Sequence, residues 1–215
     1  APRGPPLSTG GVHGLVQVGA PKAGDTVVVS AAAGSVGMYV GQIAKALGCR
    51  AVGIAGGPEK CAWVVEELGF DACVDYRDPG FFKALKAACP DGVDVYFDNV
   101  GGAVLETALF LMNLKGRVVC CGAVSQYDEG APSGPRNLPG LVVVKRLRME
   151  GFIVMDFADK DAEAEAALSG WVASGAVRVV EDVVEGLENA PAALIGLLAG
   201  ENRGKRMVRV APDPA

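Results

Sequence analysis

The sequence predicts an α/β fold in which a doubly wound parallel sheet forms a single domain. Strand-like runs rich in β-branched residues alternate with helix-like runs, and successive units start about 20 to 25 residues apart. The clearest unit is segment 26–37, where a Val-rich strand passes through a turn of small residues into a helix. Right-handed crossovers between such units place their strands side by side in a parallel sheet.

Composition and charge narrow the classes of protein to which the chain can belong. It has 215 residues, is 50% hydrophobic and carries a net charge of −5 without basic clusters, which argues against nucleic acid as a partner. No segment reaches the roughly 20 uncharged apolar residues of a membrane helix, so no membrane partner is expected. The six cysteines contain no C-x-x-C pair and His13 is the only histidine, so no metal site is predicted. Free cysteines and the lack of a signal-peptide pattern favour a cytoplasmic location.

Three strand–helix units fill the first part of the chain. After Gly37, apolar residues at steps of three and four place one face of a helix against the sheet, and Gly48 ends that helix. Pro58 fits the first turn of the next helix, and Gly69 ends it. The expected strands are 26–30, 50–55 and 72–76, and the expected helices are 37–47, 61–68 and 81–88.

The later units are less regular. The Gly- and Pro-rich segment 128–139 predicts an exposed loop. An acidic helix that follows is expected to turn Leu168, Trp171 and Val172 toward the core. The expected strands are 93–97, 116–122, 148–155 and 205–210, and the expected helices are 104–112, 141–147, 159–174 and 190–198.

The turn after the first strand carries an incomplete dinucleotide-binding fingerprint. In the G-x-G-x-x-G pattern, Ala32 replaces the first glycine, while Gly34 and Gly37 occupy the second and third positions. A glycine at position 34 lets the backbone approach phosphates, and the helix N-terminus stabilises their negative charge. A strand–turn–helix whose small residues serve only packing is the alternative. The residues predicted to bind the pyrophosphate are Gly34, Ser35, Val36 and Gly37.

The residues after the second strand favour a phosphorylated nicotinamide cofactor. NAD-specific sites place Asp or Glu at this strand end to bind the ribose hydroxyls, but this chain has Gly56 and Gly57 there. Lys60, in the first turn of the following helix, carries the positive charge that a 2′-phosphate needs. We therefore predict NADPH as the cofactor; for Lys60, the alternative is a solvated surface lysine.

Polar residues follow other strands of the predicted sheet. Tyr76, Asn99 and the loop 122–127 come after three of these strands. Because the carboxyl ends of parallel strands face the ligand crevice, we expect these residues to converge there. Taken singly, Tyr76 could cap a strand, Asn99 could form a turn, and Ser125 could provide loop polarity.

With these residues identified, the chain resembles the medium-chain dehydrogenase/reductase superfamily. Within it, the chain is similar to the zinc-independent group of prostaglandin reductases and alkenal double-bond reductases. The resemblance extends from about Pro21 to Val210. Its most specific stretches are Ala32-Ala-Gly-Ser-Val-Gly37, Ala55-Gly-Gly-Pro-Glu-Lys60, Val95-Tyr-Phe-Asp-Asn-Val-Gly-Gly102, Cys121-Gly-Ala-Val-Ser-Gln-Tyr127, Gly151-Phe-Ile-Val154 and Gly200-Glu-Asn-Arg-Gly-Lys205.

The resemblance implies a role for each matching residue. Lys60 would hold the 2′-phosphate of NADPH, and Tyr76 would lie near the adenosine half. Tyr127 would be the catalytic residue, through a hydrogen bond to the substrate carbonyl or relay of a proton; the alternative is a loop tyrosine that only packs. The residues expected toward the nicotinamide end are Asn99, Cys121, Gly122, Ala123, Val124, Ser125, Gln126, Tyr127, Phe152, Ile153, Val154 and Asn202.

The implied reaction is conjugate reduction of a small-molecule enone or alkenal. Hydride moves from NADPH to the β-carbon of an α,β-unsaturated ketone or aldehyde, and negative charge builds on the carbonyl oxygen. Hydrogen-bond donors at that oxygen lower the barrier before the α-carbon is protonated. Two alternatives stay open: an NADPH-binding remnant without independent catalysis, and a quinone reductase with the same cofactor site.

The resemblance also divides the chain into segments. Residues 1–25 would be a remnant or linker from a missing N-terminal substrate domain, 26–200 an NADP-binding Rossmann domain, and 201–215 a C-terminal turn and strand. Val12 occupies the tyrosine position of the family, and His13 is expected to be an incidental loop residue. The resemblance further allows a homodimer that pairs the sixth strands edge to edge.

Overall fold

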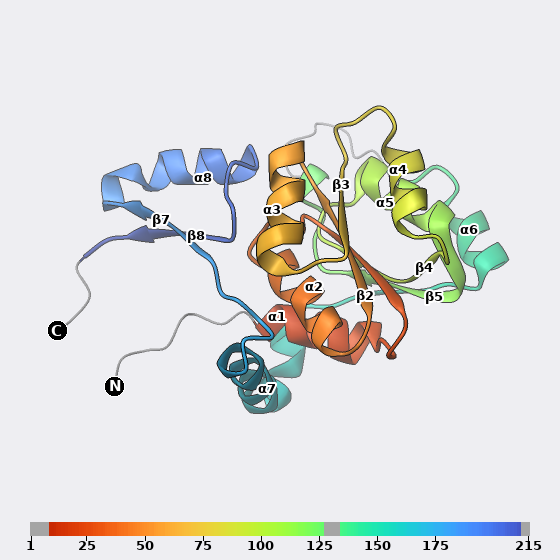
Figure 1. The fold of residues 1–215 in the computed structure, drawn as a ribbon, viewed down its shortest axis with the longest axis horizontal. Coiled ribbons are helices and arrows are strands. Elements are labelled where there is room, and N and C mark those ends of the chain that lie inside the picture. The colour runs from red at the N-terminus through yellow and green to blue at the C-terminus, as the bar shows by residue number, and fades with distance from the viewer. Residues whose placement is uncertain (1–8, 127–133, 212–215) are drawn as a thin grey trace.

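The computed structural model describes residues 9–126 and 134–211, and its main body is a six-stranded parallel sheet (Figure 1). The strand order is β3-β2-β1-β4-β5-β6, so the chain builds outward from β1 first to one edge and then to the other. This order confirms the doubly wound α/β fold. The strands are β1 (Thr26–Ser30), β2 (Arg50–Ala55), β3 (Ala72–Asp75), β4 (Val93–Asp98), β5 (Met112–Cys120) and β6 (Arg148–Gly151).

Helices cover both faces of this sheet. They are α2 (Gly37–Ala46), α3 (Pro58–Leu68), α4 (Phe81–Ala88), α5 (Gly102–Leu111), α6 (Leu138–Lys145) and α7 (Asp161–Ala173). Val27 and Val29 of β1 pack in the layer with α2, α3 and α7, whereas Val28 packs with α4 and α5. A strand buried on both faces needs a continuous apolar run, which explains the valines of β1. None of the helices in the described ranges is long and apolar enough to cross a membrane.

The segment ahead of β1 forms helical turns that pack into the core. Helix α1 (Thr9–Val12) continues into a π-helical segment (His13–Gly19), in which His13 is 1% exposed and Leu15 is fully buried. The expectation that His13 lies in a loop is wrong. Its segment is rich in glycine, but these glycines allow close packing: a Cβ at Gly14 would lie 2.7 Å from the Phe97 ring.

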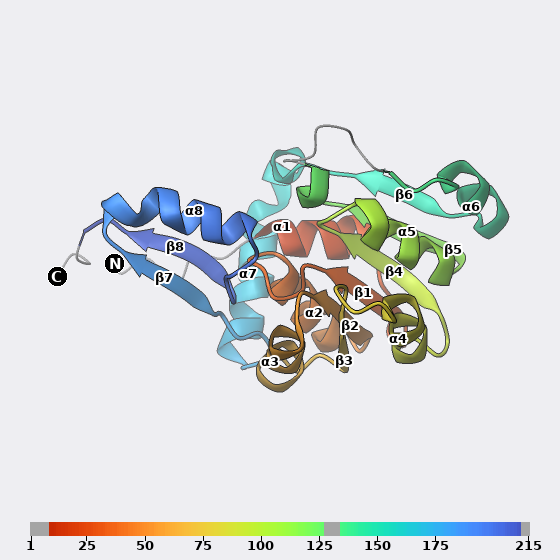
Figure 2. The ribbon, with the colours of Figure 1, turned by 90° about the horizontal axis from the view of Figure 1, so that it is seen from above.

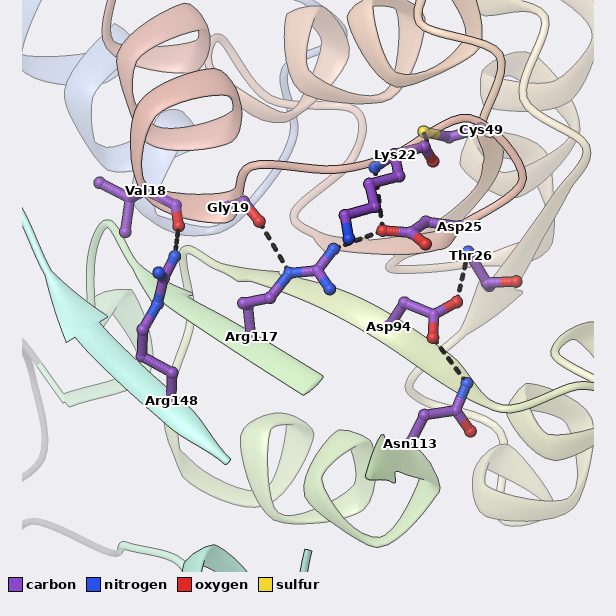
Figure 3. Close-up of polar contacts among 10 residues, drawn as sticks. All are labelled: Val18, Gly19, Lys22, Asp25, Thr26, Cys49, Asp94, Asn113, Arg117 and Arg148. Atoms are coloured by element: carbon purple, nitrogen blue, oxygen red, sulfur yellow. Dashed lines mark hydrogen bonds and ion pairs between the residues drawn. The ribbon is translucent and has the colours of Figure 1, made fainter. Parts of the chain in front are cut away.

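Polar contacts hold the link between this segment and β1 (Figure 3). Nε of Arg117, on β5, donates to the Gly19 carbonyl oxygen at 2.9 Å, and its guanidinium also pairs with Asp25. Oδ2 of Asp94, on β4, accepts a hydrogen bond from the Thr26 N–H at 2.9 Å. Strands β4 and β5 therefore fix where the chain enters β1, and so where the following glycine turn lies.

A second, smaller unit follows the main sheet. Strands β7 (Glu181–Glu185) and β8 (Lys205–Arg209) pair in parallel, and α8 (Ala190–Leu198) lies between them in the chain. Figure 2 shows this unit extending to one side of the main body. The sequence predicts the helix and the last strand, but not that β7 and β8 form a sheet of their own.

Three predicted boundaries need correction. The strand expected over 148–155 ends at Gly151, because β6 pairs with β5 only that far, and a 3₁₀ helix begins at Val154. The helix expected over 141–147 begins at Leu138, where Pro139 fits the first turn. The strand expected over 116–122 begins at Met112, which pairs with β4 ahead of an irregularity in register.

Candidate functional site

The turn between β1 and α2 folds the chain tightly back on itself. Ala31 has φ +50°, and α2 begins at Gly37. A Cβ atom at Gly37 would lie 2.3 Å from the Ala31 carbonyl oxygen, so a side chain cannot fit without moving the backbone. At Gly34 a Cβ would lie 3.2 Å from the same oxygen. The geometry at Gly37 matches the close helix–strand packing that the third fingerprint glycine provides.

The loops after β2 and β3 meet beside this turn. Oδ1 of Asp75 accepts hydrogen bonds from the Gly57 and Arg77 N–H groups, both at 2.9 Å. A Cβ at Gly56 would lie 3.0 Å from the Tyr76 ring and 3.1 Å from Arg77 Nε. The Arg77 guanidinium lies 5.7 Å from the centroid of the Tyr76 ring. Glycine at position 56 therefore leaves room for one aromatic and one cationic side chain.

Four cations gather near the start of α3, and we call Lys60, Arg77, Arg203 and Arg206 the cationic cluster. Burial lowers the pKa of Lys60 below its usual value, the three arginines lower it further, and Asp182 opposes them. Asp182 accepts a hydrogen bond from Arg206 Nε at 2.9 Å, so the repulsion is only partly compensated. Arg203 is likewise paired with Glu59, at 3.1 Å, so a bound dianion would gain mainly from the charges of Lys60 and Arg77.

The segment after α8 returns to the glycine turn and to α3. The Gly204 N–H donates to the Ala33 carbonyl oxygen at 2.8 Å, and Lys60 donates to the Gly200 carbonyl oxygen. Asn202 is 6% exposed, and its Nδ2 donates to the Gly204 carbonyl oxygen at 2.8 Å. The structure therefore places the segment that contains Asn202 beside both the glycine turn and α3, and the expected position of Asn202 toward the nicotinamide end stays a prediction.

A buried hydrogen-bond network follows β4. Oδ1 of Asp98 accepts hydrogen bonds from the Tyr96 hydroxyl at 3.0 Å, the Ser30 hydroxyl at 3.2 Å and the Gly101 N–H at 2.9 Å. Asn99 donates from its backbone to Ser30 Oγ at 2.8 Å and from Nδ2 to the Ser30 carbonyl oxygen at 2.7 Å. Ser30 ends β1, so this network holds Asn99 at the start of the glycine turn.

Backbone hydrogen bonds attach the loop after β5 to the end of β4. The N–H groups of Cys121 and Gly122 donate to the Asp98 carbonyl oxygen at 2.8 and 3.1 Å. The Ser125 hydroxyl donates to the Val100 carbonyl oxygen at 2.6 Å. Burial raises the pKa of Cys121 to about 11, so this thiol stays protonated at neutral pH. The loop is thus held by its backbone beside Asn99, as its position after a parallel strand predicts.

The structure describes the end of this loop only in part. Ala123 precedes a short 3₁₀ turn (Val124–Gln126), and Val124 is 45% exposed. Tyr127, the expected catalytic residue, lies outside the described residues. Its role in catalysis stays a prediction.

Phe152 belongs to an aromatic cluster that begins after β6. Its ring centroid lies 6.3 Å from that of Phe97 and 6.1 Å from that of Phe157, both in edge-to-face geometry. Ile153 and Val154, which follow it, are 57% and 38% exposed. The aromatic ring is therefore fixed by packing, while the next two side chains are open to a ligand or to solvent.

Three arginines of the cationic cluster were missed by sequence reasoning. Arg77 follows a short strand, and Arg203 and Arg206 flank a turn near the C-terminus, where basic residues are usually solvated. A basic residue directly after a strand of a parallel sheet is the signal that could have identified Arg77. In the described ranges, the structure has no group of three or more His, Cys, Asp or Glu side chains placed to hold a metal ion.

Comparison with known proteins identifies the family to which the chain belongs. The zinc-binding dehydrogenase family matches residues 35–170, a range that starts within the glycine turn and includes most of the main sheet. The chain belongs to this family. Within it, the chain is 46% identical to the NADPH-dependent curcumin reductase of Escherichia coli, over 93% of this chain and 59% of that protein.

Other relatives agree with this placement. The NADP⁺-dependent 2-alkenal reductase of Nicotiana tabacum is 45% identical over 93% of this chain and 58% of its own length. The crystal structure of Vibrio vulnificus CurA in complex with NADPH superposes with a TM-score of 0.91 at 44% identity, covering 95% of this chain and 62% of that one. These relatives confirm the resemblance to the alkenal reductase group. The chain spans about three fifths of their length.

Proposed function

We propose that this chain binds NADPH and takes part in reducing the carbon–carbon double bond of α,β-unsaturated ketones or aldehydes. The observation that carries the proposal is the cationic cluster, which meets the glycine turn at the carboxyl ends of the strands. No carboxylate ends β2 to repel a 2′-phosphate, because Gly56 and Gly57 stand there. Similarity to NADPH-dependent reductases at 44–46% identity supports the same cofactor.

The residues present fit a phosphorylated dinucleotide. The glycine turn would hold the pyrophosphate at the start of α2, a ten-residue helix. Lys60 and Arg77 would bind the 2′-phosphate, since both lie at the end of the sheet where β2 and β3 finish. The Tyr76 ring, already in contact with Arg77, would offer a face for the adenine.

NADPH, when bound, supplies a hydride for the β-carbon of the substrate. The chain's own residues would orient the cofactor and stabilise charge on the substrate. The buried Ser30–Asn99 bonds would keep Asn99 in place beside the nicotinamide end. Tyr127 would donate a hydrogen bond to the carbonyl oxygen as negative charge develops there, and so lower the barrier.

A homodimer and a cytoplasmic location complete the proposal. β6 is one of the two edge strands of the main sheet, and pairing of β6 from two copies would continue the sheet across the dimer. Sedimentation would test this independently of activity: a dimer is expected, and a monomer at micromolar concentration would contradict it.

A turnover assay tests the proposed activity. Purified protein would be mixed with NADPH and a medium-length enone, and the absorbance of the reduced cofactor would be followed together with the product. We expect NADPH oxidation and a product in which the carbonyl group survives. Binding without oxidation would indicate a cofactor-binding module without independent catalysis. Turnover of quinones but not of enones would favour a quinone reductase.

A further inference from the structure

His13, the only histidine of the chain, joins the segment ahead of β1 to the segment that follows β6. Its ring stacks on Phe157 of the 3₁₀ helix η3 (Val154–Lys160), with ring centroids 5.0 Å apart and planes 8° from parallel. Its Nε2 lies 2.9 Å from Oδ1 of Asp161, the first residue of α7. Figure 1 and Figure 2 both show α7 beside α1, which directly precedes His13. One buried side chain therefore contacts both η3 and α7.

The two ring nitrogens of His13 have different surroundings. The carboxylate of Asp161 only accepts hydrogen bonds, so Nε2 carries the hydrogen that is donated to it. Nδ1 is buried and has no hydrogen-bond partner among the described residues, which costs free energy that a phenylalanine ring would not cost. Stacking on Phe157 needs only a flat ring. The property that a histidine adds at this position is therefore its hydrogen bond to Asp161.

The segment after β6 begins at the carboxyl end of the main sheet. The Phe152 N–H donates to the carbonyl oxygen of Cys120, the last residue of β5, at 3.4 Å. The Phe152 ring contacts the Phe157 ring edge to face, with centroids 6.1 Å apart. Between these two rings in the chain, the side chains of Ile153 and Val154 are exposed. Packing therefore fixes the backbone that carries two open apolar side chains.

The sheet topology puts this segment at the nicotinamide half of the proposed site. In the strand order β3-β2-β1-β4-β5-β6, Lys60 and Arg77 lie where β2 and β3 end, and the glycine turn follows β1. A dinucleotide with its 2′-phosphate at these two cations and its pyrophosphate at the turn extends its other half over the ends of β4, β5 and β6. Ile153 and Val154 follow β6 there. This step rests on the proposed NADPH function; the contacts of His13 do not.

We propose that His13 is a positioning residue for the nicotinamide half of the cofactor. Its hydrogen bond to Asp161 holds the start of α7, and with it the preceding η3, against the segment ahead of β1. Ile153 and Val154 are thereby kept where they line the nicotinamide. Loss of the bond releases η3 but leaves the cationic cluster as it is. The contacts of the cofactor with its nicotinamide half therefore weaken, while those with its 2′-phosphate do not.

Titration with the whole cofactor and with a fragment of it tests this assignment. NADPH carries the nicotinamide half, whereas 2′,5′-ADP carries the adenosine and the 2′-phosphate without it. His13→Phe keeps a ring for Phe157 and removes the hydrogen bond. It should weaken NADPH binding about fivefold or more and leave 2′,5′-ADP binding within about twofold, as calorimetry would measure. The emission of bound NADPH, which comes from the reduced nicotinamide, should also move toward that of free NADPH.

Variants of Asp161 test the same bond without a change in the core, because the Asp161 side chain is 44% exposed. Asp161→Ala should weaken NADPH binding as much as His13→Phe does, and Asp161→Asn, which keeps an acceptor oxygen, should lose less. The double variant His13→Phe/Asp161→Ala should lose no more than either single variant, since both remove one bond. Asp159→Ala removes a carboxylate at an exposed position of η3; it is the matched control and should leave NADPH binding unchanged.

Three results would overturn the role of His13. They are unchanged NADPH binding in His13→Phe and Asp161→Ala, equal weakening of NADPH and 2′,5′-ADP, and additive losses in the double variant. Titration of the unmodified protein decides the proposed function first. If it binds neither ligand, that function fails and the role of His13 fails with it. If it binds both and the variants bind them equally well, the cofactor site stands and only the role of His13 fails.

Discussion

The six-stranded main body and the β7–α8–β8 unit differ in how completely their apolar side chains are buried. In the main body every residue of β1 is buried, and both faces of the sheet are covered by helices. In the smaller unit, α8 is almost entirely apolar, yet Leu194 is 57% and Ile195 is 69% exposed. Helices that are apolar on all sides are normally buried. Burial therefore stabilises the main body far more than it stabilises α8.

The two regions nevertheless build the candidate site together. The main body supplies the glycine turn, Lys60 and Arg77, while the turn before β8 and β8 itself supply Arg203 and Arg206. The hydrogen bond from the Gly204 N–H to Ala33 attaches one region to the other. The smaller unit thus contributes charge to the site rather than hydrophobic core.

The largest expected effect is a core truncation in the main body. Phe97→Ala removes a fully buried ring that packs against Phe152, and it should lower the free energy of unfolding by about 3–5 kcal/mol. Leu194→Ala on α8 is the comparison and should cost less than about 1 kcal/mol, since that side chain is mostly exposed. Chemical denaturation followed by circular dichroism measures both. Equal losses would contradict the contrast between the two regions.

Charge removal at the shared site should have a smaller, ligand-specific effect. Lys60→Ala should weaken NADPH binding about tenfold or more, because a charge-assisted hydrogen bond to phosphate is lost, and should leave NADH binding nearly unchanged. Lys83→Ala, at an exposed position on α4, is the matched control and should alter neither. Fluorescence titration with both cofactors measures the difference. Equal weakening of NADPH and NADH would mean that Lys60 does not bind the phosphate.

The smallest expected effect is on the way in which the free energy of unfolding depends on acid pH. Burial raises the pKa of Asp71, but hydrogen bonds from Lys45 and the Ala51 N–H outweigh it, so the pKa is lower in the folded chain. Its stabilisation is therefore present above the ordinary Asp pKa of about 3.9 and is lost as pH falls through the lower folded value. Asp71→Asn should remove less than about 1 kcal/mol at neutral pH and flatten this acid dependence.

A matched change in the smaller unit sharpens that comparison. Glu185 pairs with Arg209 across β7 and β8, and both side chains are largely exposed. Glu185→Gln should change the stability at neutral pH by no more than about 0.5 kcal/mol. Thermal unfolding over a pH series measures both variants. A larger loss for Glu185→Gln than for Asp71→Asn would contradict the ranking of the two regions.

The main sheet could be predicted because its signals are local. The Val-rich run of β1 and the apolar periodicity of α2 each lie within a few turns of chain, and they identify the elements and their parallel order. The buried segment around His13 could not be predicted in this way, since its glycines are typical of a loop when no packing partner is known. The independent β7–β8 sheet likewise depends on a pairing between distant segments.

The sequence predicts those residues of the candidate site that follow the strands of the sheet. Asn99 and Lys60 follow strands of the sheet, and their neighbourhood can be inferred from topology alone. Arg203 and Arg206 lie more than 140 residues after Lys60 in the chain, so only the folded structure brings them to it.

The affinity ratio of the unmodified protein for NADPH and NADH tests the central claim most directly. The two cofactors differ only in the 2′-phosphate, so the ratio reports on the residues around that phosphate, the cationic cluster and the end of β2. The account predicts that NADPH binds at least about tenfold more tightly at low salt, and that the preference shrinks as salt screens the charges. Equal affinities, or tighter binding of NADH, would contradict it.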